Sequence, residues 1–264
     1  MDATGNAYVT GQFYGTNATF YDAAGQQANA PTWNSVGNND GYVIKYDPNG
    51  NLWQPSLPVV STPPQSTAIV AGGSVTFTVA ASGYTPILYQ WQRNGVNVVG
   101  ATSASYTPPS PTLADHGAQF TCVVSNYGGT TNSAAATLNV FATAIEVWRF
   151  SYFGTNANTG SAADDADPDK DGLKNLIEYA LGSDPLGSSA SAAPVAGIVG
   201  GNLSMTVTQL AAVSGITYGA EWSATLNGND WQAIADSGTG LTHAFSNPIG
   251  SASRMFMRMK ITTP

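Results

Sequence analysis

The chain alternates short apolar runs with turn-forming residues along most of its length. Runs rich in Val, Thr, Tyr and Phe are separated by Gly, Pro and Asn, which is the pattern of β-strands joined by tight turns. Strand patterns occupy residues 74–80, 89–92, 203–208, 216–222, 231–235 and 255–261. With 264 residues, the chain is long enough for two or three domains. We therefore predict a mainly β protein with several domains.

Two segments carry apolar residues at helical spacing instead. In residues 144–153, the side chains of Ile145, Trp148 and Tyr152 fall on one face of a helix. The second segment has apolar residues at Leu173, Leu176, Ile177, Ala180 and Leu181, followed by Gly182 as a stop signal and by Pro185. We predict two short helices here, with Trp148 in an apolar core.

Composition narrows the class of protein. Charged residues make up 9% of the chain, and Gly, Ser, Thr, Asn and Ala are abundant, which is typical of secreted bacterial surface proteins of the β class. The net charge is −8 and the eight basic residues are dispersed, so the sequence offers no phosphate-binding patch and argues against nucleic acid as a partner. No membrane span is expected. Cys122 is the single cysteine, which excludes an intrachain disulfide.

The acidic run over residues 167–178, D-P-D-K-D-G-L-K-N-L-I-E, places carboxylates where a twelve-residue, EF-hand-like calcium loop needs them. Gly172 stands at position 6, where such a loop turns sharply. The expected ligands are Asp167, Asp169, Asp171, the backbone carbonyl of Leu173, Asn175 either directly or through water, and Glu178 with both oxygens. This oxygen set favours Ca²⁺ over Mg²⁺, which prefers a tight octahedron with retained waters.

A solvated acidic loop without any ion is the alternative interpretation. Seven of the 16 acidic residues lie between positions 164 and 184, and only Lys170 and Lys174 offset them. Without a cation these carboxylates would repel one another, which favours the metal site.

The spacing also carries a resemblance. Position 8 is Lys174, where paired EF-hand loops have an apolar residue. Residues 167–185 resemble the single calcium loops of bacterial thrombospondin type 3-like repeats, with the pattern D-x-D-x-D-G-L-x-N-x-x-E-Y-x-x-G-x-D-P. The resemblance implies a structural calcium ion and not a signalling switch.

A second resemblance lies in the middle of the chain. Trp91 is followed by the turn Arg93-Asn94-Gly95, and further on the chain reads Asp115-x-Gly117-x-x-Phe120-x-Cys122. Residues 58–140 resemble the immunoglobulin family through these positions. Val79 stands where the partner cysteine would be, and Phe120 replaces the corner tyrosine. We therefore expect Cys122 to pack as a small apolar residue beside Trp91, in a sandwich held by burial alone.

The two ends of the chain resemble further modules. Residues 2–11 read D-A-T-G-N-A-Y-V-T-G and residues 40–53 read D-G-Y-V-I-K-Y-D-P-N-G-N-L-W, with strands expected over 7–10 and 41–46. The region 1–54 resembles one bacterial β-propeller repeat, of the type D-x-x-G-N-x-Y-V-T-G followed by D-x-x-V-x-K-Y-D-x-x-G-N-x-x-W. Because a propeller needs about four blades or more, we expect a longer protein whose start is missing. An independent small hairpin domain is the alternative.

Residues 194–264 follow a Ser- and Ala-rich linker. They resemble a C-terminal β module of large exported proteins from Verrucomicrobia-like bacteria, through Y-x-x-E-x-S-x-x-L-x-x-x-x-W over residues 218–231 and the stretch R-M-F-M-R-M-K-I. In the last strand, Phe256, Arg258 and Lys260 should lie on the face opposite the Met residues and Ile261.

These observations predict four regions. They are an incomplete propeller repeat (1–54), an immunoglobulin-like domain (58–140), a two-helix segment with a calcium loop (142–186) and a small C-terminal β-sandwich (194–264). His116 and His243 fall in different regions, and no nucleophile elbow, metalloprotease helix or phosphate loop is present, so we expect no enzyme.

We predict a non-catalytic structural or adhesive region of an extracellular or cell-surface protein, with one calcium ion rigidifying the joint between domains. The first alternative is an accessory region of a larger secreted enzyme that binds carbohydrate such as polysaccharide, or protein; exposed rings at Trp33, Trp222 or Trp231 would favour it. The second is a module that docks another surface protein.

Overall fold

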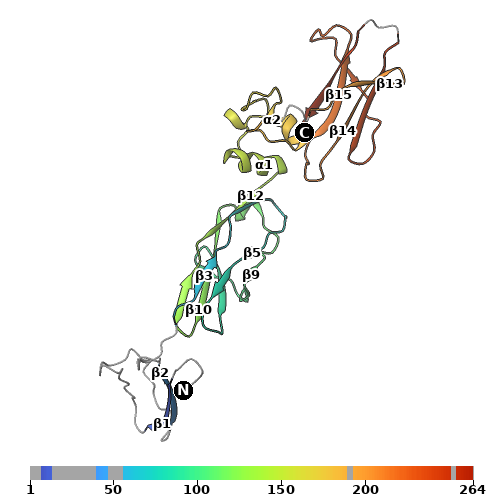
Figure 1. Cartoon of the computed structure of the whole chain (residues 1–264). Helices are drawn as coiled ribbons and strands as arrows, with labels where there is room; N and C mark the ends of the chain where they lie inside the picture. Colours follow the sequence, from blue (N-terminus) through green and yellow to red (C-terminus); the bar gives the residue numbers. More distant parts are fainter. Residues whose placement is uncertain (1–6, 14–39, 47–55, 189–192, 251–253, 264) are drawn as a thin grey trace.

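The computed structural model describes residues 7–13, 40–46, 56–188, 193–250 and 254–263. An N-terminal strand pair, a central sandwich, a helical segment and a C-terminal β unit follow one another along the molecule (Figure 1). In the N-terminal part, β1 (Ala7–Phe13) pairs antiparallel with β2 (Asp40–Tyr46). Both expected strands are present. Trp33 and the turn predicted over residues 47–50 lie outside the described residues, and the propeller repeat stays a prediction.

The central sandwich is built around one large sheet with the strand order β4-β12-β10-β7-β8, to which β11 adds by pairing with β10. Strand β4 runs parallel to β12, and the other neighbours are antiparallel. Two small pairs, β3–β6 and β5–β9, complete the unit. Its elements are β3 (Val59–Thr62), β4 (Thr67–Val70), β5 (Phe77–Thr78), β6 (Ala80–Ser82), β7 (Leu88–Arg93), β8 (Val96–Asn97), β9 (Ser105–Tyr106), the 3₁₀ turn η1 (Leu113–Asp115), β10 (Ala118–Asn126), β11 (Gly129–Asn132) and β12 (Ala136–Phe141).

The single strand predicted over residues 74–80 is wrong in its extent. Residues 74–76 form no strand, and the remainder is divided between β5 and β6. The division occurs because the chain changes partners. The N–H of Val79 still bonds the Ala104 carbonyl at 2.9 Å, on the β9 side, whereas the next residues pair with β3. Strand periodicity alone does not reveal such a change of partner.

Aromatic burial forms the core of the sandwich. Trp91 and Cys122 face each other in the β7–β10 register, and neither is accessible to solvent. Phe77 stacks on Phe120 with ring centroids 4.7 Å apart. Cys122 is a free thiol, and burial raises its pKa, so it stays protonated. Val79 is buried as well, which confirms the expected apolar replacement of a cross-sheet disulfide.

Both predicted helices are present. Helix α1 (Ala144–Phe153) has the expected bounds and begins with a capping box, in which Glu146 Oε2 accepts a hydrogen bond from the N–H of Thr143 at 2.9 Å. Helix α2 (Asn175–Leu181) is capped by Gly182, whose φ of 70° lies in the left-handed region that favours glycine. Among the described residues, no helix is long and apolar enough to cross a bilayer.

The C-terminal unit contains two three-stranded sheets, ordered β13-β14-β17 and β16-β15-β18. Its strands are β13 (Gly197–Val199), β14 (Asn202–Thr208), β15 (Thr217–Ser223), β16 (Gln232–Ile234), β17 (Thr242–Pro248) and β18 (Phe256–Thr262). Four of them match the expected strands. The sequence did not predict strands β13 and β17. Strand β17 is largely polar and only Phe245 on it is fully buried, so it lacks the apolar pattern of a strand. In β18, Arg258 and Lys260 point to solvent and Ile261 is buried, as expected.

The helices join the two β units. Ala180 of α2 shares a core with Met205 and Phe245 of the C-terminal unit. The hydroxyl of Tyr218 donates a hydrogen bond to the Ala180 carbonyl at 2.6 Å. On the other side, Phe150 of α1 meets Phe141 at the end of β12, with ring centroids 5.1 Å apart. The helical segment therefore contacts both neighbours and shares a core with the C-terminal unit.

Replacing Phe120 with Ala should lower the free energy of unfolding by about 3–5 kcal/mol, because the ring is 1% exposed and its loss leaves a cavity beside Phe77. Urea unfolding followed by tryptophan fluorescence measures this change. Val99→Ala is the control, since that side chain is 99% exposed and its loss should change the free energy by less than about 0.5 kcal/mol. Equal effects of the two substitutions would contradict the packing described.

Candidate metal centre

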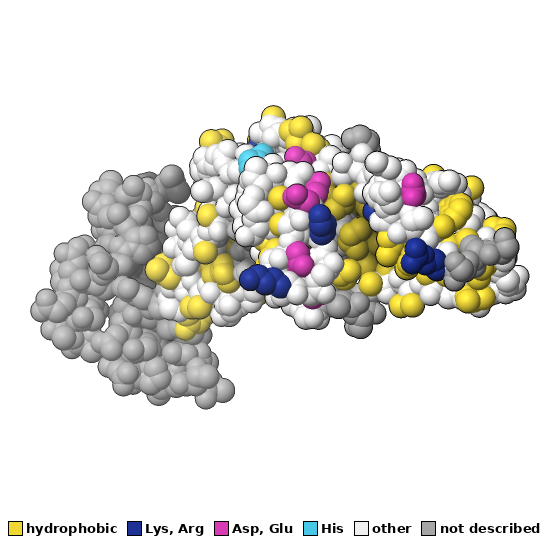
Figure 2. Space-filling model, turned by 90° about the horizontal axis from the view of Figure 1, so that it is seen from above, with side chains coloured by type: hydrophobic (Ala, Val, Ile, Leu, Met, Phe, Trp, Pro, Cys, Tyr) yellow, Lys and Arg dark blue, Asp and Glu magenta, His cyan; other side chains and the backbone are white. Residues whose placement is uncertain are grey.

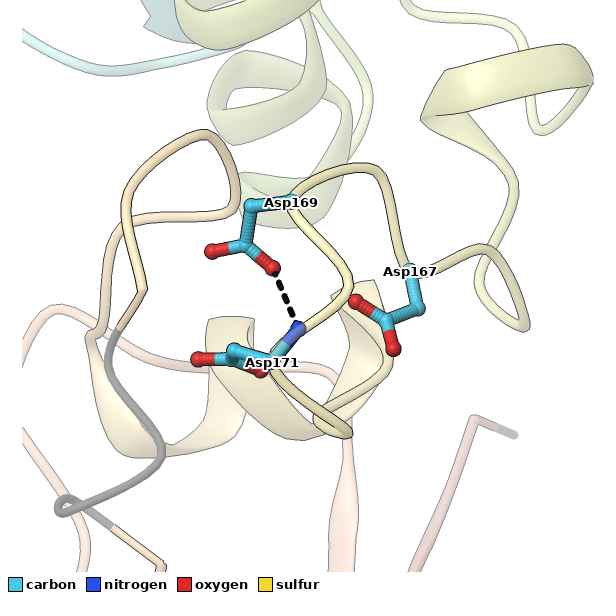
Figure 3. A group of neighbouring side chains, drawn as sticks. All are labelled: Asp167, Asp169 and Asp171. Carbon is cyan, nitrogen blue, oxygen red and sulfur yellow. Dashed lines mark hydrogen bonds between the residues drawn. The ribbon is translucent and has the colours of Figure 1, made fainter.

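The carboxylates predicted at positions 1, 3 and 5 of the loop lie together. One oxygen from each of Asp167, Asp169 and Asp171 lies within 4.8 Å of the others, on the loop that precedes α2 (Figure 3). The chain achieves this by turning tightly. Gly172 has a φ of 94°, which confirms the sharp turn expected at position 6.

Backbone N–H groups hold one oxygen of each carboxylate. The N–H of Gly172 donates to Asp167 Oδ2 at 3.0 Å, that of Asp171 to Asp169 Oδ1 at 3.1 Å, and that of Leu173 to Asp171 Oδ1 at 2.8 Å. The other oxygens of two of these groups, Asp167 Oδ1 and Asp169 Oδ2, are buried and find no hydrogen-bond donor in the described part of the chain. A buried acceptor without a donor is costly, and a hard cation would satisfy both atoms.

Asn175 offers a third buried oxygen. The residue is 1% exposed at the start of α2, and its Nδ2 donates to the carbonyls of Ser161 and Ala163 at 2.7 and 2.8 Å. These two bonds fix which way the amide points. Its Oδ1 is buried and has no donor among the described residues. The side chain expected at position 9 therefore presents an oxygen suited to a cation or to its bound water.

Glu178 stands apart from the group of three Asp residues. Glu178 is completely buried on α2, and Ser183 Oγ donates to its Oε1 at 3.5 Å. Its carboxylate does not lie within the 4.8 Å group formed by the three Asp residues. The structure therefore assembles positions 1, 3 and 5. Direct ligation by Glu178 and by the carbonyl of Leu173 stays a prediction.

The electrostatics of the loop disfavour negative charge. Burial raises the pKa of Asp169, and the neighbouring carboxylates of Asp171 and Asp167 raise it further, against the lowering effect of the Asp171 N–H. Basic side chains are scattered over the face shown in Figure 2. In the C-terminal unit, Arg258 and Lys260 pair with Glu221. A bound cation would supply the positive charge that these carboxylates otherwise lack.

Sequence reasoning missed one pair beside the loop. Arg149 of α1 is 5% exposed, and its Nη2 lies 2.5 Å from Asp164 Oδ1. The signal was present in the sequence, because Arg149 follows the buried Ile145 by four residues and so shares its helical face. A basic residue in that stripe, followed by an acidic run, indicates a buried ion pair.

Comparison with known proteins identifies the central sandwich. A family model described as immunoglobulin domain matches residues 58–126. The central sandwich is an immunoglobulin-like domain. Solved structures similar to this chain include a chimeric titin Z1Z2 functionalised with an exogenous peptide from decorin, which is 25% identical, has a TM-score of 0.29 and covers 34% of this chain and 100% of its own.

Two further solved structures resemble the chain. Titin domain M7 is 22% identical over 33% of this chain and 97% of its own, with a TM-score of 0.30. The tandem immunoglobulin repeats of Dlar are 18% identical over 52% of this chain and 82% of their own, with a TM-score of 0.31. A search of curated proteins found no match.

Replacing Asp169 with Asn should raise the melting temperature of chelator-stripped protein near neutral pH. The substitution removes a charge that burial and its neighbours disfavour, and it keeps an oxygen for the Asp171 N–H. Because the folded pKa is raised, this carboxyl costs stability as the pH rises through that pKa. Below the ordinary value of 3.8, both states are protonated, so the gain should disappear.

Thermal unfolding with a chelator, at neutral pH and in acid, provides the measurement. Asp165→Asn is the matched control, because it removes one charge from the same acidic run at an exposed position and should give a smaller rise. A lower melting temperature for Asp169→Asn at neutral pH would show that its charge is stabilised by the loop.

Proposed function

We propose that this chain is a non-catalytic structural or adhesive region of an extracellular or cell-surface protein, in which one calcium ion rigidifies the joint between the immunoglobulin-like domain and the C-terminal β unit. The observation that carries the proposal is the set of buried oxygens without donors, on Asp167, Asp169 and Asn175, in a loop at that joint. Calcium takes six to eight oxygen ligands and accepts mixed carboxylate and carbonyl donors. Asp171, Glu178 and the carbonyl of Leu173 complete the proposed set.

The position of the loop supports a mechanical role. It leads directly into α2, whose Ala180 lies in the core of the C-terminal unit. Tyr179 of the same helix packs with Ile145 of α1 and Val213 of the C-terminal unit in a second cluster. An ion that orders the loop would therefore order the start of a helix that both neighbours contact.

The fold supports a non-enzymatic function. Immunoglobulin-like domains commonly serve structural or binding roles. The two histidines have local partners in separate units. His116 Nδ1 lies 3.0 Å from the Val140 carbonyl oxygen, and His243 lies between Asp236 and Gln209, at 2.7 and 3.2 Å. These local contacts support structural roles for both rings.

A polysaccharide- or protein-binding accessory region is the second candidate. It is supported by an apolar cleft of about 360 Å³ at the joint, lined by Trp148, Tyr152 and Tyr179, which is within the range of small-ligand sites. The tryptophan rings expected to be exposed give this ligand-binding candidate less support. Trp222 is half-buried and packs on the C-terminal core, and the Arg258 guanidinium lies 4.0 Å above the ring of Trp231. Trp33 is not among the described residues.

Calcium should raise the melting temperature of the wild-type protein, and the double variant Asp167→Asn with Glu178→Gln should lose this effect. At free calcium about a hundredfold above the Kd, one site stabilises the folded state by about 2.7 kcal/mol. The isosteric replacements remove two proposed ligand charges without opening a cavity at the completely buried Glu178. Calorimetric titration of chelator-stripped protein, with thermal unfolding in parallel, measures both binding and stabilisation.

Asp165→Asn serves as the control, because Asp165 is exposed and belongs to the same acidic run without being a proposed ligand. It should keep one calcium site and the full stabilisation. Magnesium should give a weaker effect. An unchanged calcium shift in the double variant would place the ion elsewhere, and the lack of any binding in the millimolar range would leave a metal-free acidic loop.

A further inference from the structure

A buried ion pair connects α1 to the chain just before the proposed ligands. The side chain of Arg149 is 6% exposed and that of Asp164 is 23% exposed. Asp164 is held from a second direction, because Asn158 Nδ2 donates to its Oδ2 at 2.9 Å and its own N–H donates to Asn158 Oδ1 at 2.7 Å. The carboxylate that receives Arg149 therefore has a fixed position.

The backbone around Asp164 is bonded to the start of α2. The Asp164 carbonyl accepts the N–H of Leu176 at 3.1 Å, and the Ala166 carbonyl accepts the N–H of Asn175 at 2.9 Å. The Ala163 carbonyl accepts the side-chain amide of Asn175, the residue whose Oδ1 is buried without a donor. Hydrogen bonds thus run from Arg149 through residues 163–166 to the loop and to α2.

Stability alone does not account for a buried arginine here. Nε of Arg149 is buried and has no hydrogen-bond partner within the described residues. Desolvating a charged pair costs about as much as its attraction returns, and apolar replacements of such pairs are often neutral or stabilising. In some proteins, a buried polar or ionic group instead fixes one arrangement of the elements that it joins. In this chain it joins the helix that contacts the immunoglobulin-like domain to the loop that would hold the ion.

We propose that Arg149 is a positioning residue that couples the order of the metal loop to α1, so that ion binding stiffens the immunoglobulin side of the joint as well as α2. This inference rests on the proposed function, since the ion is the calcium proposed there. In this coupling, the ion orders residues 167–178. The ordered loop and the start of α2 hold residues 163–166 in place, and Asp164 in turn holds Arg149.

A second route between the helices is separable from this one. The ring of Trp148 packs edge-on against Tyr179, with centroids 5.7 Å apart. That contact reaches the middle of α2, whereas Arg149 reaches the chain ahead of Asp167. A substitution at Arg149 therefore tests one connection and leaves the aromatic contact in place.

Amide hydrogen exchange of the full chain, with and without calcium, tests the coupling. At free calcium about tenfold above the Kd, amides whose exchange requires the loop to open should slow about elevenfold. In the wild type, we expect this slowing in both α1 and α2. In Arg149→Met, α2 should still slow, and α1 should lose most but not all of its calcium-dependent slowing, because the contacts of Tyr179 with Trp148 and Ile145 still connect the two helices.

Two variants separate coupling from general destabilisation. Arg149→Lys keeps the charge and should restore part of the calcium-dependent slowing in α1. Arg93→Met removes an arginine–aspartate pair of the same length from the immunoglobulin-like domain, where Arg93 Nη2 lies 2.5 Å from Asp115 Oδ1 and the arginine side chain is 45% exposed, and it should leave the calcium effect on α1 intact. If Arg149→Met does not fold, Asp164→Asn removes the charge of the other partner of the ion pair. The same pattern of amide exchange in α1 and α2 is expected for it.

The outcomes distinguish this inference from the proposed function. Calcium-dependent slowing of α1 that is as large in Arg149→Met as in the wild type would overturn the coupling. Slowing of α2 without slowing of α1 in the wild type would also overturn it and would leave the calcium site intact. No calcium effect on any amide of the wild type would overturn the proposed function and this inference with it.

Discussion

The joint between the two β units depends on one constraint: several side-chain oxygens of the metal loop are buried away from water. Asp167, Asp169 and Asn175 each carry a buried oxygen that no described donor reaches, while backbone N–H groups and carbonyls fix the remaining atoms of these side chains. The two carboxylate oxygens require a proton or a cation, and the amide oxygen of Asn175 requires a cation or its bound water. The raised pKa of Asp169 expresses the same constraint in electrostatic form. Because the loop runs straight into α2, whatever satisfies these oxygens also determines how firmly that helix begins.

The two sides of the helical segment differ in their attachment. Towards the immunoglobulin-like domain, α1 offers the ring contact between Phe150 and Phe141. Towards the C-terminal unit, α2 contributes Ala180 to a shared core and receives the hydroxyl of Tyr218. Helix α1 lies against both β4 and β12, so its attachment is not made by one ring alone, whereas α2 is built into the core of its neighbour.

Local signals in the sequence were sufficient for the helices and for the turn of the loop. Helix α1 carries its own capping box and its own apolar face, and Gly172 stands where a left-handed residue is required. Contacts between distant residues were not predictable in this way. The change of partner near Val79 and the pairing of the largely polar strand β17 both depend on what the rest of the chain places nearby. Local signals also did not predict that Glu178 would be buried outside the group of three Asp residues.

The sharing of a core between α2 and the C-terminal strands has a consequence for modular inheritance. The Ser- and Ala-rich stretch after Gly187 has the composition of a linker between independent domains, yet the segments on its two sides bury apolar surface against each other. A recombination event within that stretch would leave Met205 and Phe245 without part of their cover. A duplication or exchange that begins before Thr143 would carry the helices, the loop and the last strands together as one heritable unit.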